Sequence, residues 1–116
     1  MLTIAVLVFA VGAVGGLILA NSVLRGRLAS WGLSLLHAAL GATGLVLTAI
    51  VVLGSTDVAK IVPTALIILV VAALAGFFLA SYHARKVSPP RGAVIAHAAI
   101  AVVGFLLLVG GAFSLI

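Results

Sequence analysis

Two histidines stand out among the few residues of this chain that could do chemistry. His37 lies in the stretch SLLHAALGATG and His97 lies in VIAHAAIAVVG, and both stretches otherwise consist mainly of apolar and small residues. An ionisable side chain inside a membrane span is energetically costly and marks a functional site by default. Neutral imidazole is also the commonest metal ligand among protein side chains. We therefore expect these two histidines to carry the function of the chain.

The composition around the histidines predicts a membrane protein. Of the 116 residues, 66% are hydrophobic and only 6% are charged, and a soluble domain would need a more polar exterior. A membrane-spanning helix needs about 20 apolar residues. Four segments meet this requirement and leave no soluble domain: residues 2–24, 29–53, 59–82 and 93–116. The expected fold class is an all-α, four-helix transmembrane bundle that forms one domain over residues 1–116.

The distribution of charge predicts how the bundle is oriented. Two short loops between the expected spans carry five cations: Arg25, Arg27, Arg85, Lys86 and Arg91. The middle loop has only Lys60, offset by Asp57. Because Lys and Arg accumulate on the cytoplasmic side, we expect cytoplasmic basic loops and exoplasmic termini, with the bacterial inner membrane as the location. Membrane lipid is thus an expected partner and nucleic acid is not, since no soluble basic face with polar readers exists.

The second half of the chain repeats the first half without a gap. Arg25 aligns with Arg85, and the HAA that begins at His37 aligns with the HAA that begins at His97. These coincidences carry weight because Arg and His are rare in this chain. We interpret the sequence as a tandem duplication of a helical hairpin, with repeats at about 1–56 and 61–116. Parallel repeats are related by an axis along the membrane normal, so the two histidines should face one another at one depth.

Each histidine heads a stripe of small residues on one helix face. His37 is followed by Gly41 and Gly44, and His97 by Ala101 and Gly104. Further small residues lie on the first and third spans: Gly12, Gly16 and Ala20, and Ala72, Gly76 and Ala80. Small residues allow another helix or a flat ligand to approach closely.

The constellation favours haem as the partner of the two histidines. Two imidazoles on opposed helices can ligate one iron from both faces, so we expect one haem b per chain with His37 and His97 as axial ligands. Gly41, Gly44, Ala101 and Gly104 would make room for the macrocycle. Arg25, Arg85 and Arg91 could pair with its propionates.

A histidine followed by glycine within an apolar helix resembles the ligand helices of small membrane cytochromes of the b type. The resemblance is carried by His37 with Gly44 and by His97 with Gly104. It implies electron transfer near the quinone pool, with a quinone or redox protein as partner and a homo-oligomer or larger membrane complex as the assembly. The chain departs from the four-histidine, two-haem pattern of many such cytochromes, since only two histidines lie within its spans.

Two other functions stay open. The chain could be a cofactor-free structural subunit whose histidines only form hydrogen bonds, or a small proton-coupled transporter. The small multidrug-resistance transporters have similar size and four spans, but they rely on an embedded glutamate, and this chain has none. No nucleophile–base pair, carboxylate dyad or phosphate loop is present, so we do not expect an enzyme. Two histidines without a carboxylate or thiol also make a poor zinc or copper site.

Overall fold

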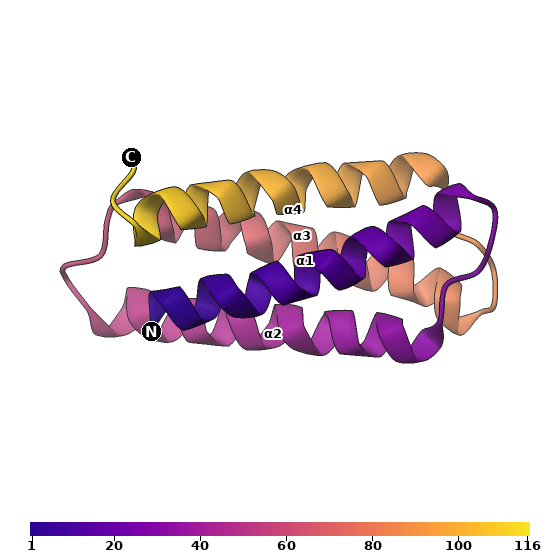
Figure 1. Ribbon diagram of the computed structural model, residues 1–116, viewed down its shortest axis with the longest axis horizontal. Coiled ribbons are helices and arrows are strands. Elements are labelled where there is room, and N and C mark those ends of the chain that lie inside the picture. Colours follow the sequence, from indigo (N-terminus) through magenta and orange to yellow (C-terminus); the bar gives the residue numbers. More distant parts are fainter.

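The computed structural model describes all 116 residues and contains four α-helices and no strands. They are α1 (Leu2–Leu24), α2 (Trp31–Gly54), α3 (Ile61–Ala84) and α4 (Arg91–Ala112) (Figure 1). Each helix is long and apolar enough to cross a membrane. The predicted all-α, four-helix transmembrane bundle is therefore confirmed.

The helices form an elongated bundle of 44 × 21 × 19 Å. The closest packing occurs within the hairpins α1–α2 and α3–α4. Weaker contacts join α1 to α4 and α2 to α3, so α2 and α4 lie on one diagonal and α1 and α3 on the other. Figure 1 shows both chain termini and the α2–α3 loop at one end, and the other two loops at the opposite end.

The last helix begins and ends earlier than the sequence suggested. It begins at Arg91 rather than residue 93, directly after Pro90, whose ring fixes its φ and supplies no N–H. It ends at Ala112 because the chain turns back on itself. Ser114 takes a positive φ of 56°, and the N–H of Leu115 donates to the carbonyl of Gly110 at 2.7 Å. This closing pattern is a Schellman motif, and it leaves the last residues outside the helix.

The two basic loops have the same backbone geometry. Gly26 has a φ of 78° and Lys86 a φ of 57°, and the two positions align when the two halves of the sequence are superposed. Each follows the C-cap of its helix and closes a Schellman motif. The N–H of the next residue donates to a carbonyl in the last turn of the helix: Arg27 to Ser22, and Val87 to Tyr82. The two hairpins therefore turn in the same way.

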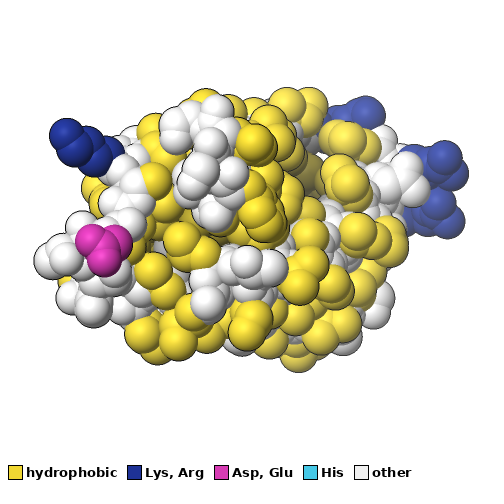
Figure 2. All heavy atoms as spheres, turned by 60° about the vertical axis from the view of Figure 1, so that its left-hand side comes forward, with side chains coloured by type: hydrophobic (Ala, Val, Ile, Leu, Met, Phe, Trp, Pro, Cys, Tyr) yellow, Lys and Arg dark blue, Asp and Glu magenta, His cyan; other side chains and the backbone are white.

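Apolar side chains cover the middle of the bundle, and charged side chains gather at its ends (Figure 2). Large apolar residues are exposed along all four helices, as at Leu17 and Phe77, which is the surface that a lipid environment requires. The interior is narrow. Thr48 and Leu108, which align between the two halves of the sequence, are both fully buried, and the Thr48 hydroxyl donates to the Gly44 carbonyl at 2.8 Å.

Packing between α3 and α4 depends on a glycine at their shared end. A Cβ at Gly111 would lie 2.6 Å from Cγ2 of Val62 and 2.7 Å from Cγ2 of Ile61. Both neighbours are β-branched, and their limited rotamers leave little freedom to yield. We expect Gly111→Ala to lower the free energy of unfolding by about 1–3 kcal/mol, measured by denaturation in detergent micelles.

Gly41→Ala is the matched control, because nothing lies within 4 Å of the added Cβ. Alanine has the higher helix propensity, so this variant should be neutral or more stable by less than about 1 kcal/mol. Equal destabilisation of the two variants would contradict the packing described here.

Candidate functional site

The two histidines inside the spans meet across the middle of the bundle, toward its basic end, six residues after the first residue of α2 and of α4. His37 lies on α2 and His97 on α4, which are diagonal to each other. Their ring centroids are 6.3 Å apart, and their planes are nearly perpendicular, at 89°. The expectation that the two rings face each other across the bundle is confirmed. Only side chains bridge α2 and α4, because the backbones of these two helices are not in contact.

A backbone carbonyl of the neighbouring helix anchors each ring. Nδ1–H of His37 donates to the carbonyl of Gly12 at 2.8 Å, and Nδ1–H of His97 donates to the carbonyl of Ala72 at 2.8 Å. A carbonyl can only accept, so each ring is protonated at Nδ1 and has its lone pair at Nε2 when neutral. The two bonds match in length and in sequence separation, and they fix both rings in the same tautomer.

The second ring nitrogens have no partner within the chain. No side-chain hydrogen bond reaches Nε2 of either histidine, and no enclosed side-chain nitrogen or oxygen lacks a partner. Both Nε2 atoms are therefore partly accessible, and each lies beside a glycine of the neighbouring helix: a Cβ would be 3.4 Å away at Gly16 and 3.8 Å away at Gly76. Histidine ligands commonly hold a metal with one ring nitrogen while the other donates to a backbone carbonyl.

The centroid separation of the two rings matches that of two imidazoles sharing one metal ion, and it is also that of an ordinary edge-to-face ring contact. Two metal–nitrogen bonds of about 2 Å would place the centroids of two coaxial imidazoles about 6 Å apart. The observed separation is 6.3 Å. No group of three or more His, Cys, Asp or Glu residues is assembled anywhere in the chain, so a bare zinc ion would lack ligands. The donor set fits haem, for which two protein ligands are sufficient.

Two glycines on α1 and α3 make room for the rings. A Cβ at Gly16 would lie 2.8 Å from Cε1 of His37, and one at Gly76 would lie 3.2 Å from Cε1 of His97. The sequence marked both glycines only as parts of packing ridges. Their alignment with each other in the two repeats, together with that of the histidines, is the signal that could have placed them at the site.

The small residues on α2 and α4 serve a different purpose from the one expected. A Cβ at Gly44 would lie 2.7 Å from the ring of Phe9, and one at Gly104 would lie 2.9 Å from the side chain of Leu69. The room predicted here for a macrocycle is thus filled by the partner helix of each hairpin. Of the remaining stripe residues, Gly41 borders open space and Ala101 is half-buried.

The three arginines expected to meet propionates lie at the basic end of the bundle. Nη2 of Arg91 donates to the carbonyl of Leu24 at 2.8 Å and joins α4 to α1. The guanidinium of Arg85 lies 4.6 Å from the centre of the Tyr82 ring. The side chain of Arg25 is exposed. Propionate pairing by these residues stays a prediction.

The third histidine does not join the pair. His83 lies at the C-terminal end of α3 and packs against Trp31 at the start of α2, with ring centroids 4.5 Å apart and ring planes tilted by 44°. This contact belongs to the basic end of the bundle. His83 is therefore a natural control for His37 and His97.

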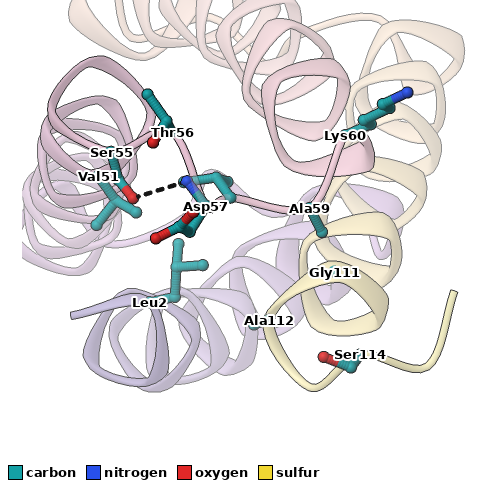
Figure 3. Close-up of a pocket in the computed structure, with 11 residues that line it drawn as sticks. Leu2, Val51, Ser55, Thr56, Asp57, Ala59, Lys60, Gly111, Ala112 and Ser114 are labelled. Atoms are coloured by element: carbon teal, nitrogen blue, oxygen red, sulfur yellow. Dashed lines mark hydrogen bonds between the residues drawn. The ribbon is translucent and has the colours of Figure 1, made fainter.

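A pocket of about 550 Å³ lies at the opposite end, between the α2–α3 loop and the ends of α1 and α4. Figure 3 shows Asp57 close to Leu2, while the side chain of Lys60 points away from it. The backbone N–H of Asp57 donates to the Ser55 hydroxyl at 3.2 Å. None of the residues that line this pocket belongs to the histidine site.

Comparisons of the chain with protein-family models, with curated proteins and with solved structures found no match. The candidate site is therefore defined by the geometry of the chain itself. Its parts are two imidazoles from opposed helices, the carbonyls that orient them and the glycines that admit them.

The anchoring bonds predict the tautomer of each ring. In ¹⁵N-histidine NMR of the protein in micelles, His37 and His97 should both carry the proton on Nδ1 and not on Nε2. His83, whose ring makes no such bond, is the internal reference. Signals from the Nε2–H tautomer at either central histidine would contradict the anchoring described here.

Proposed function

We propose that this chain is an integral membrane electron carrier of the b type, with one haem b held between His37 and His97. One observation carries the proposal. Two imidazoles from diagonal helices meet with centroids 6.3 Å apart, each anchored through Nδ1 and each with an unbonded Nε2. The haem would supply reversible one-electron transfer, and two protein ligands would leave its iron no open position for substrate.

The residues around the rings have distinct tasks in this proposal. The carbonyls of Gly12 and Ala72 hold the ring orientations and raise the basicity of the ligating nitrogens. Gly16 and Gly76 admit the rings between the helices. The apolar spans around them keep the site within the hydrocarbon layer and away from bulk water.

The duplication and the orientation in the membrane belong to the same proposal. Anchors, loop geometry and buried positions recur at equivalent places in the two hairpins, which supports an origin from two copies of one hairpin. With the basic loops in the cytoplasm, Arg25, Arg85 and Arg91 would pair with the propionates on the cytoplasmic side of the membrane. A quinone or a redox protein, within a homo-oligomer or a larger membrane complex, would exchange electrons with the chain.

A cofactor-free structural subunit is the second candidate. Phe9 and Leu69 fill the space in front of Gly44 and Gly104, which favours helices packed against one another over helices parted by a macrocycle. In that case each histidine only ties α1 to α2 or α3 to α4. Such an interhelical hydrogen bond stabilises a membrane protein by about 0.6–2 kcal/mol.

The absorption spectrum of the detergent-purified protein separates the two candidates. The electron carrier should show a b-type spectrum that changes on reduction. His37→Ala and His97→Ala should each lower haem retention by at least about tenfold, because each removes a ligand, and His83→Ala should retain the wild-type spectrum.

A colourless wild-type protein, purified from cells supplied with haem, would overturn the haem proposal. A spectrum unchanged by both central substitutions would overturn the ligand assignment. Colourless protein whose stability falls in the His37 and His97 variants would instead support the structural subunit.

A further inference from the structure

The basic end of the bundle carries a concentrated, uncompensated positive charge. Five of the six Lys and Arg residues lie there: Arg25, Arg27, Arg85, Lys86 and Arg91. The only acidic residue, Asp57, lies in the α2–α3 loop at the other end of a molecule 44 Å long. Figure 2 shows a group of Lys and Arg side chains at one end, and the acidic side chain together with a further cationic side chain at the other.

With the four helices spanning a membrane, the loops at this end would lie at the height of lipid headgroups. Each is short, 25–30 and 85–90, and joins two membrane-spanning helices. The only Trp and the only Tyr of the chain, Trp31 and Tyr82, are both at this end. These residue types favour the membrane–water interface. Leu28 and Val87 are exposed beside the cations, so both loops offer apolar and basic groups together.

Contacts between the hairpins hold the two loops side by side. The hydrogen bond from Arg91 to the Leu24 carbonyl joins α4 to α1, and the tilted ring contact of Trp31 with His83 joins α2 to α3. The loops therefore form one surface across the end of the bundle. Arg27 and Lys86 are exposed on it and have no side-chain partner within the chain.

We propose that this basic end binds anionic phospholipid headgroups, with Arg27 and Lys86 contacting their phosphates. The charge is complementary to an anionic headgroup, and the height and exposed apolar groups of the loops place it against lipid rather than against a soluble acidic protein. Neither residue belongs to the histidine site, so the proposal is independent of haem.

Native mass spectrometry of the full-length protein in detergent micelles tests this proposal, since a micelle imposes no membrane orientation. Phosphatidylglycerol or phosphatidylcholine is added at equal concentration. The wild-type protein should retain phosphatidylglycerol preferentially. The double variant Arg27→Gln/Lys86→Gln should retain at least about fivefold less phosphatidylglycerol than the wild type. The control Lys60→Gln, which removes the cation at the other end, should retain as much as the wild type.

Circular dichroism of each variant verifies that it is folded. A measurement on the wild-type protein alone adds an independent check: phosphatidylglycerol retention should fall as ionic strength rises, because exposed charges are screened. Equal retention of the two lipids by the wild type, or unchanged retention by the folded double variant, would overturn the proposal. Binding of soluble glycerol phosphate as strong as that of the lipid would overturn the assignment to lipid.

Discussion

The hydrogen bond from each central imidazole to a carbonyl of the neighbouring helix is the interaction on which the rest of the site depends. Hydrocarbon offers no partner for a polar ring, so a histidine inside a membrane span must find one within the protein. The carbonyls of Gly12 and Ala72 meet this need. The same bonds fix which nitrogen carries the proton and hold α1 to α2 and α3 to α4.

Repetition of this bond in two hairpins creates a site that neither hairpin has alone. Each hairpin supplies one oriented ring, and the bundle brings the ring centroids to 6.3 Å from each other. Gly16 and Gly76 allow this approach because a side chain at either position would crowd an imidazole. Each hairpin thus contains the same three parts: an imidazole, the carbonyl that accepts its hydrogen bond, and a glycine beside the ring.

The sequence predicts much of this fold but only part of the site. Long apolar runs predict the four helices, and the rare His and Arg coincidences between the two repeats predict that His37 and His97 face each other. The carbonyl anchors were not predictable, because every residue has a carbonyl and residue type does not mark the one that accepts. The packing of the Phe9 ring against Gly44 was missed for another reason. A stripe of glycines predicts that some group approaches the helix closely, but it does not distinguish a neighbouring helix from a ligand.

The proposed function requires that the two rings, which meet as a crossed pair, hold one iron between them. Electron paramagnetic resonance of the oxidised, haem-loaded protein probes this requirement, since the ferric signal reports both the number of axial imidazoles and the angle between them. Because the ring planes cross at 89°, we expect a low-spin signal of high anisotropy, as two crossed imidazoles produce. A high-spin axial signal, which indicates that one imidazole is not bound, would contradict the proposed ligation.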